Sequence, residues 1–223
     1  MFPVSFAQRR LWFLSRLGET GAAYNCPLTT RLRGPLDPQA LAAALGDLTG
    51  RHEVLRTVFP EVDGEPVQQI TDGAPELPVV RLGEAELADA LAAEAGHVFD
   101  LTAELPLRAR LFALGDEEWV LALVIHHIAT DGWSWGPLLT DLAAAYAARL
   151  AGAEPAFEPL PVQYRDHTVW QRSVLGAEGD PDAPITRQLA FWTEELAGAP
   201  AELALPYDRP RPAVASFAGG SVP

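Results

Sequence analysis

The 223-residue sequence contains no lysine, so its 16 basic residues are all arginines, against 30 acidic residues and a formal net charge of −14. A surface of that charge repels nucleic acid and anionic membranes, which excludes both as general partners. The single cysteine, Cys26, excludes an internal disulfide framework and a zinc site built from thiolates.

Long apolar runs are also missing, since the longest, at 119–125, has the length of a strand. The first residues lack a charged segment followed by an apolar stretch, which is the pattern of a secretory signal. Neither a membrane span nor a leader is therefore predicted, and we expect a cytoplasmic protein.

Hydrophobic periodicity predicts an α/β chain whose length suits one large unit. Asp37 and Pro38 are typical of a helix start, as N-cap and first-turn proline. Helices are expected at 5–17, 38–50, 83–99, 136–152, 164–175 and 185–198, and strands at 24–34, 55–59, 66–70, 77–82 and in a hairpin over 105–127. The second strand of that hairpin is apolar on both faces, which predicts a central, buried position in the sheet.

Two catalytic patterns overlap in HHIATDGWSWG, at 126–136. The G-x-S-x-G pattern around Ser134 is typical of serine hydrolases, in which a strand runs directly into the first glycine. Here the apolar strand stops near Ile125, and only one histidine, His167, follows the serine. A helix start, where the Ser134 hydroxyl accepts from free backbone N–H groups, explains the serine better.

The H-H-x-x-x-D-G pattern from His126 to Gly132 is the stronger candidate. Adjacent residues of a strand point to opposite faces, so both histidines cannot bind one metal ion, and no metal site is predicted. One histidine should face a site at the carboxyl end of the strand, where α/β folds place ligands, and the other should face the core. Asp131 is expected to hold the turn through an ion pair.

The residues 126–134 resemble the HHxxxDGWS motif of condensation domains from nonribosomal peptide synthetases. The chain matches four further family motifs in order. They are SFAQRRLWFL at 5–14, RHEVLRTVF at 51–59, YRDHTVWQ at 164–171, and FWTEELAGAP followed by LPYDRPRP within 191–212. The opening motif and DGWS favour condensation over epimerization domains. The details at 5–14 and 24–36 favour the subtype that joins two L-configured residues. The retained histidines disfavour heterocyclization domains.

The resemblance implies the chloramphenicol acetyltransferase-like fold, in which a lobe has a central mixed sheet flanked by helices. Family members have two lobes in tandem, and all the matches belong to the first. We therefore interpret 1–198 as an N-terminal lobe and 199–223 as a Pro-rich linker or crossover toward a missing C-terminal lobe. An excised, a truncated and a naturally split domain remain open.

The resemblance also implies an amide-forming acyltransferase that joins aminoacyl or peptidyl thioesters. Its partners would be the donor and acceptor carrier proteins, whose phosphopantetheine carries the substrates, and the domain itself would need no cofactor. An arginine patch on the first helix, Arg9, Arg10 and Arg16, is a candidate for docking them, with a solvated helix face as the equal alternative. A single-lobe acyltransferase and a carrier-binding half without catalysis are the alternative functions.

Residue roles follow from the same resemblance. His127 would be the catalytic residue facing the substrates, and the backbone N–H of Gly132 would stabilise the oxyanion. The site would be supported by His126 through packing, by Asp131 paired with Arg56 or Arg51, and by Trp133 and Ser134. Trp133 and Trp135 are predicted core or tunnel-wall aromatics, and Tyr164 is predicted to pack.

Overall fold

A computed structural model describes residues 1–17, 21–210 and 212–214. The chain divides into two compact units, Met1–Val169 and Trp170–Pro223. The predicted division of the chain at residue 198 stays a prediction. Residues 211 and 215–223 of the predicted linker lie outside the described residues.

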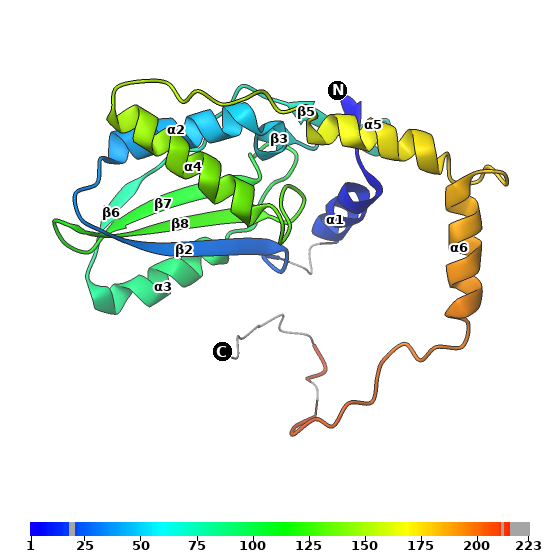
Figure 1. Cartoon of the computed structure of the whole chain (residues 1–223). Helices are drawn as coiled ribbons and strands as arrows, with labels where there is room; N and C mark the ends of the chain where they lie inside the picture. The colour runs from blue at the N-terminus through cyan, green and yellow to red at the C-terminus, as the bar shows by residue number, and fades with distance from the viewer. Residues whose placement is uncertain (18–20, 211, 215–223) are drawn as a thin grey trace. The chain divides into compact units, whose positions relative to one another are not determined.

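The first unit is built on a mixed four-stranded sheet, as predicted. The strands in spatial order are β2 (Asn25–Arg33), β8 (Glu118–His126), β7 (Leu107–Ala113) and β6 (Val79–Arg81) (Figure 1). The pairs β2–β8 and β7–β8 are antiparallel, whereas β6 runs parallel to β7. In this register Asn25 lies opposite His126, at the end of the central strand β8.

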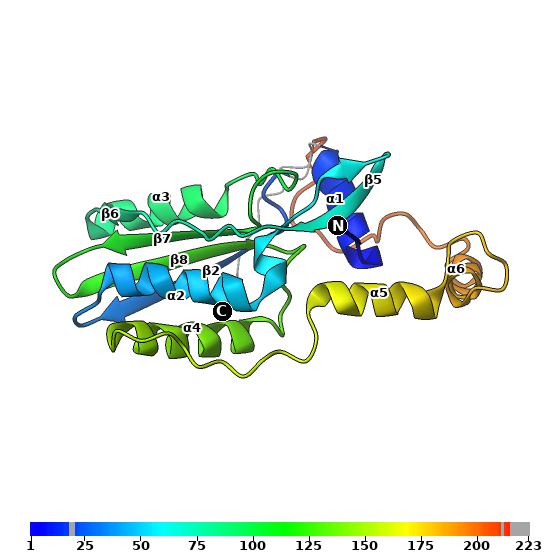
Figure 2. The same ribbon diagram turned by 90° about the horizontal axis from the view of Figure 1, so that it is seen from above.

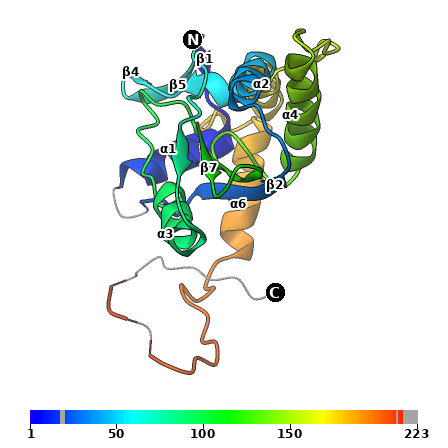
Figure 3. The ribbon, with the colours of Figure 1, turned by 90° about the vertical axis from the view of Figure 1, so that its left-hand side faces the viewer.

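Helices cover both faces of this sheet, with α2 (Pro38–Arg51) and α4 (Trp135–Leu150) on one face and α3 (Glu84–Ala95) on the other (Figures 2 and 3). The apolar side chains of β8 pack against the helices on both faces of the sheet. Leu123 and Ile125 are buried in the core shared with α2 and α4, while Val120 and Ala122 pack with Leu87 of α3. This confirms the predicted central, buried position of β8.

The predicted helix starts are confirmed by their caps. Asp37 accepts from the backbone N–H groups of Gln39 and Ala40, and Pro38 is the first residue of α2. Ser5 and Gln8 form a capping box at the start of α1 (Phe6–Arg16). Each cap satisfies N–H groups that the first turn of a helix leaves free, which fixes where these helices begin.

A smaller sheet is built around β5 (Glu65–Ile70). Three short strands pair with β5, namely β1 (Phe2–Pro3), β3 (Thr57–Val58) and β4 (Glu61–Val62). The predicted strand at 55–59 is partly wrong, because 53–56 form a turn of 3-10 helix. The Leu55 N–H donates to the His52 carbonyl, and the Thr57 hydroxyl donates to the Glu53 carbonyl. Five residues are too few for periodicity to separate one helical turn from a strand.

A buried polar network ties α1, β5 and the start of α5 (Tyr164–Leu175) together within the first unit. The hydroxyls of Ser5 and Tyr164 lie 2.9 Å apart. The Gln68 amide donates to the Thr168 hydroxyl at 3.4 Å and accepts from Gln8 at 3.5 Å. Because Ser5, Gln8, Gln68 and Thr168 are all at most 1% exposed, these bonds hold the Tyr164 end of α5 in a defined place.

The second unit contains the rest of α5 and helix α6 (Pro184–Glu195). Gly176 ends α5 with φ +76°, and a Cβ there would lie 2.8 Å from the Cβ of Ala183, so a side chain would be both strained and crowded. The predicted helix at 185–198 is confirmed except for its last residues. In the part of the chain that the structure describes, no helix has the length and apolar character to cross a bilayer.

Candidate active site

Strand β8 ends at His126, and His127 opens the turn that follows. His126 is 4% exposed, whereas His127 is exposed. The two adjacent histidines thus have the different surroundings that the sequence predicted, one in the core and one facing outward.

His126 is held among aromatic rings at the end of the sheet. Its Nδ1 accepts from the Ile128 N–H at 3.1 Å, and its ring centroid lies 6.0 Å from that of Phe99 and 6.4 Å from that of Tyr24. Burial, with a smaller contribution from His127, lowers the pKa of His126 to about 4. The His126 ring is therefore neutral at neutral pH and almost completely buried. These surroundings suit the packing role predicted for it.

The His127 side chain is fixed by the turn that it opens. Its backbone N–H donates to the Tyr24 carbonyl at 2.8 Å, and its Nδ1 lies 2.5 Å from the Thr130 carbonyl oxygen. A carbonyl oxygen only accepts, so Nδ1 carries the hydrogen. The neutral ring then has its lone pair at Nε2, where it can accept a hydrogen bond or a proton from an amine.

His127 lines a cavity of about 310 Å³. Its walls come from α1, the turn before α4, the segment after α2 and the start of α5: Ala7, Arg10, Leu11, Val54, His127, Ile128, Ala129, Thr130, Asp131, Ser134 and Tyr164. The structure therefore brings together three of the predicted site residues, His127, Asp131 and Ser134. Tyr164, which we expected only to pack, is a wall of the cavity, and the matching 164–171 motif was the available signal.

Asp131 does not form the predicted ion pair with Arg56 or Arg51, so that prediction is wrong. Asp131 is exposed, and its Oδ1 accepts from the N–H groups of Trp133 at 3.1 Å and Ser134 at 3.0 Å. The same oxygen accepts from the Ser134 hydroxyl at 2.7 Å, which is the largest cause of the lowered pKa of Asp131. The physical reason is local, because the turn before α4 presents free N–H groups within reach of this carboxylate.

The predicted role of Ser134 as the acceptor for free N–H groups is also wrong. Asp131 fulfils that role, and the Ser134 hydroxyl instead accepts from the Asp131 N–H at 3.0 Å. Because this hydroxyl is bonded to Asp131 rather than to a histidine, the arrangement does not resemble a serine hydrolase.

The two arginines expected at the site support α2 instead. Arg56 donates to the backbone carbonyls of Thr49 and Thr71. Arg51 donates through Nε to Asp141 of α4 at 2.8 Å. Arg51 is the last residue of α2, and Arg56 ends the 3-10 turn that follows it. Their partners are the carboxylate of Asp141 on α4 and the carbonyls of Thr49 and Thr71, rather than Asp131.

Gly132 and Trp133 form the exposed tip of the turn. Within the described part of the chain, the Gly132 N–H donates to no acceptor, and a Cβ at this position would meet no atom within 4 Å. This N–H is therefore available as a donor, and its role at an oxyanion stays a prediction. Trp133 is 90% exposed, so it is no core residue of this chain, whereas Trp135 packs against the core.

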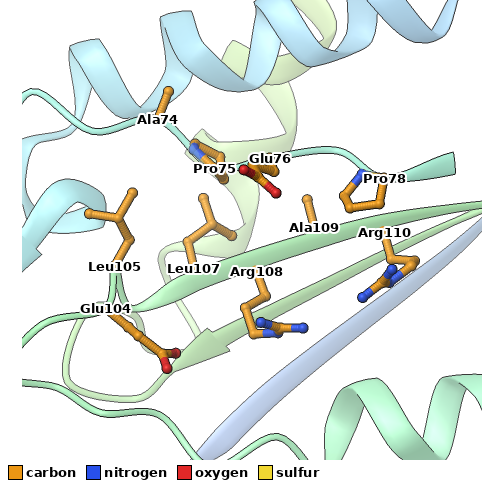
Figure 4. Close-up of a pocket in the computed structure, with 10 residues that line it drawn as sticks. All are labelled: Ala74, Pro75, Glu76, Pro78, Glu104, Leu105, Leu107, Arg108, Ala109 and Arg110. Carbon is orange, nitrogen blue, oxygen red and sulfur yellow. The ribbon is translucent and has the colours of Figure 1, made fainter.

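A larger cavity of about 460 Å³ lies elsewhere, along the first half of β7 (Figure 4). Figure 4 shows Arg108 and Arg110 on one side of the strand and Leu107 and Ala109 on the other. Both arginines already pair with Glu94 of α3, at 3.4 and 2.6 Å. No histidine is among the described residues that line it, and their charges are balanced, so it is the weaker candidate.

The described side chains form no metal-binding cluster. Across 1–17, 21–210 and 212–214, no three His, Cys, Asp or Glu side chains are placed to hold a metal ion. The arrangement around His127 instead fits general-base or positioning chemistry on an amine.

Relatives with similar sequences are large synthetases. The chain is 56% identical over 220 residues to a probable non-canonical nonribosomal peptide synthetase, CymA, of Salinispora arenicola, covering 98% of this chain and 3% of that protein. It is 50% identical over 223 residues to the dimodular nonribosomal peptide synthase of Bacillus subtilis, covering 99% and 9%. The chain thus spans a small part of the curated relatives that it matches.

Solved structures agree with this relationship. The X-domain in complex with OxyB from teicoplanin biosynthesis superposes with a TM-score of 0.86 at 42% identity, covering 95% of this chain and 47% of that one. The starter condensation domain of the rhizomide synthetase RzmA shares the fold, with a TM-score of 0.75 at 21% identity, covering 90% of this chain and 48% of that one. The family model named Condensation domain matches residues 1–222. The chain therefore belongs to the condensation domain family of nonribosomal peptide synthetases.

Proposed function

We propose that this chain contributes the catalytic histidine of a condensation domain that forms peptide bonds between carrier-bound thioesters. The observation that carries the proposal is the His127 ring, whose Nδ1 hydrogen is bonded to the Thr130 carbonyl and whose Nε2 is left as an acceptor. Family membership supports the reaction class, because condensation domains are amide-forming acyltransferases that work with carrier-protein domains.

In the proposed reaction the amine of the acceptor attacks the carbonyl carbon of the donor thioester. The C–N bond forms while His127 Nε2 takes the N–H proton, and the carbonyl oxygen becomes an oxyanion. The free N–H of Gly132 is the candidate donor to that oxyanion, a contribution worth roughly 3 kcal/mol in comparable sites. The C–S bond then breaks, and the sulfur leaves as a thiol with the proton returned from His127.

Substrates and the rest of the site belong to the proposal as well. The donor and acceptor groups would be carried on the phosphopantetheine of two peptidyl carrier proteins, and the domain would hold no cofactor of its own. Since the chain covers about half of the solved condensation-type structures, we propose that a second lobe supplies the remaining walls. Two of the three arginines suggested for carrier docking are partly engaged, Arg9 with Glu65 at 3.5 Å and Arg16 with Glu61 at 3.4 Å.

The test is a condensation assay with donor and acceptor carrier proteins loaded with aminoacyl groups. His127→Ala should lower the rate by about 100-fold or more, because general-base or positioning groups contribute on that scale. His97→Ala is the matched control, since His97 pairs with Glu104 at 2.8 Å and lines no part of the His127 cavity. Equal rates for the His127→Ala variant and the unaltered protein would refute the proposal.

A recruiting role is the second candidate, because the 42%-identical X-domain was solved in a complex with another protein, OxyB. A domain of this kind would bind loaded carriers without joining their substrates. Measured carrier binding together with no product, in both the unaltered protein and His127→Ala, would favour recruitment over catalysis.

A further inference from the structure

An apolar cavity of about 330 Å³ lies between β2, α2 and α4, away from His127. Its wall Arg33 ends β2, the edge strand of the larger sheet (Figure 1), and lies opposite Glu118 at the start of β8. Because His126 is at the other end of β8, strand geometry places the two ends roughly 25 Å apart. Among the described residues, the cavity shares no wall with the one that His127 lines, so what it binds is independent of the proposed function.

Most of the wall is made of leucine side chains. The leucines are Leu32, Leu36, Leu41, Leu121, Leu139 and Leu142. Leu41, Leu121 and Leu142 are buried and form the floor, whereas Leu139 is 41% exposed and stands at the rim. The cavity thus opens to solvent and leaves apolar surface in contact with water, which a ligand of apolar character would cover favourably.

The charge of the cavity comes from Arg33. Among the described residues that line it there is no other charged side chain. The Arg33 side chain is 80% exposed, and its Nε lies 3.9 Å from Glu118, whose carboxylate is already bonded to Arg31 at 2.8 Å. Such an exposed, long pair is weak, so the Arg33 guanidinium is available to an anion at the cavity.

A second donor lines the same cavity. The Tyr146 hydroxyl accepts from the Asp37 N–H at 3.0 Å. A phenolic oxygen can donate as well as accept, and within the described part of the chain this hydroxyl donates to no acceptor. Arg33 and Tyr146 therefore offer a cation and a neutral donor beside an apolar floor, which is the arrangement that suits a carboxylate with an apolar chain.

We propose that this cavity binds a medium-chain monocarboxylate, with the carboxylate at Arg33 and Tyr146 and the chain on the leucines. The volume is about ten times the roughly 30 Å³ that one water molecule occupies in the liquid, which suits a chain of about eight carbons. The net charge of −14 repels anions in general, so an anion binds only where a local cation such as Arg33 is placed. A cationic ligand would meet Arg33 without a carboxylate in the wall to offset it.

The experiment titrates octanoate, hexanoate, 1-octanol and octylamine into the chain labelled on its leucine methyl groups. NMR shifts of Leu139 and Leu142 are followed, with Leu55 as the reference outside the cavity. Octanoate should bind about tenfold more tightly than hexanoate, because it buries two further CH₂ groups. It should bind about threefold more tightly than 1-octanol, since an exposed ion pair contributes on that scale. Octylamine should bind most weakly of the eight-carbon probes.

Variants separate the charge from the space. Arg33→Gln should weaken octanoate about threefold and leave 1-octanol unchanged. Arg81→Gln is the matched control, since the Arg81 side chain is 76% exposed, lies 3.9 Å from Asp116 and does not line the cavity. Ala143→Phe fills the space from an exposed position of α4 and should weaken both probes at least tenfold. Ala144→Phe, at the next exposed position and outside the wall, should change neither.

Four results would overturn the proposal. Equal affinities for octanoate and 1-octanol would refute the assignment to a carboxylate. Shifts of Leu55 as large as those of Leu139 would mean general adsorption rather than a site. Shifts of Leu139 that depend on protein concentration without any probe would mean that a second copy of the chain covers the cavity. The absence of shifts at tens of millimolar octanoate would refute binding altogether, and the loaded-carrier assay would still test the proposed function by itself.

Discussion

Asp131 and Ser134 bond to each other in both directions across the turn that follows His127. The Ser134 hydroxyl donates to the Asp131 carboxylate at 2.7 Å, and the Asp131 N–H donates back to that hydroxyl at 3.0 Å. The closed pair fixes the backbone between the two residues, and Thr130, whose carbonyl holds the His127 ring, comes directly before it. The exposed Asp131 and the half-buried Ser134 thus hold the backbone next to the carbonyl that orients the histidine.

We therefore predict that Ser134→Ala lowers activity more than it lowers stability. The substitution removes two hydrogen bonds at an exposed turn, which should reduce the free energy of unfolding by only about 1 kcal/mol. The loosened Thr130 carbonyl should reduce the condensation rate by roughly tenfold, as misplacement of a catalytic group does. Urea unfolding and the loaded-carrier assay measure the two effects. Ser134→Thr, which keeps the hydroxyl, should restore most of the rate, and failure of that rescue would contradict the explanation.

The sheet and its helices were predictable because their signals are local and repeated. The run 119–125 is apolar at every position, and only a strand buried on both faces needs that pattern. Caps such as Asp37 before Pro38 are satisfied by atoms a few residues away, so they too can be inferred from the sequence. The short turn at 53–56 was mistaken for a strand because one helical turn has no periodicity of its own.

The partners of charged side chains were not predictable in the same way. A buried carboxylate needs a partner, and the arginines of the RHEVLRTVF motif suggested an ion pair between Asp131 and Arg56. Two local N–H groups and a hydroxyl occupy the Asp131 carboxylate instead, and backbone carbonyls occupy Arg56. Which atoms a charged side chain contacts depends on distances that the tertiary structure sets. A motif shows which residues are present, but it does not show which of their atoms are in contact.

The bond between His127 Nδ1 and the Thr130 carbonyl predicts the tautomer of the ring. In the neutral form Nδ1 should carry the hydrogen and Nε2 the lone pair, because the carbonyl can only accept. Long-range ¹H–¹⁵N correlation spectra of ¹⁵N-histidine protein above pH 8 distinguish the two tautomers. His97 and His52, whose Nε2 atoms face carboxylates, should show the opposite tautomer in the same spectrum. A hydrogen at Nε2 of His127 would remove the basis for its proposed role as acceptor.

His126 should make stability depend on pH. Burial lowers its pKa to about 4, against about 6.5 in the unfolded chain. Between these values the unfolded chain binds a proton that the folded chain does not, so the free energy of unfolding rises with pH. The full stability is present above about pH 6.5, and acidification to pH 4 should remove up to about 3 kcal/mol.

Urea unfolding at several pH values, with His126→Leu as the comparison, isolates this contribution. The leucine variant leaves the Ile128 N–H without its partner, so it should be less stable at neutral pH. Its stability should nevertheless fall less steeply between pH 6.5 and 4, since the variant lacks the contribution of His126 and keeps every other group of the protein. Identical slopes would mean that His126 takes up its proton without penalty, contrary to its burial.

The carboxylate of Asp141 connects α4 to the end of α2 and should contribute measurably to stability. One oxygen, Oδ2, accepts from Arg51 Nε at 2.8 Å and lies 2.7 Å from His52 Nε2, and the three side chains are 15 to 20% exposed. Breaking a fully buried pair costs 3–5 kcal/mol and an exposed pair at most about 1 kcal/mol, so Asp141→Ala should cost about 2 kcal/mol. Asp116→Ala is the control, because Asp116 is 99% exposed and lies 3.9 Å from Arg81. Its unfolding free energy should change by less than about 0.5 kcal/mol. If both variants lose the same amount, the contact between α2 and α4 rests on its leucines, and Asp141 serves only to orient His52.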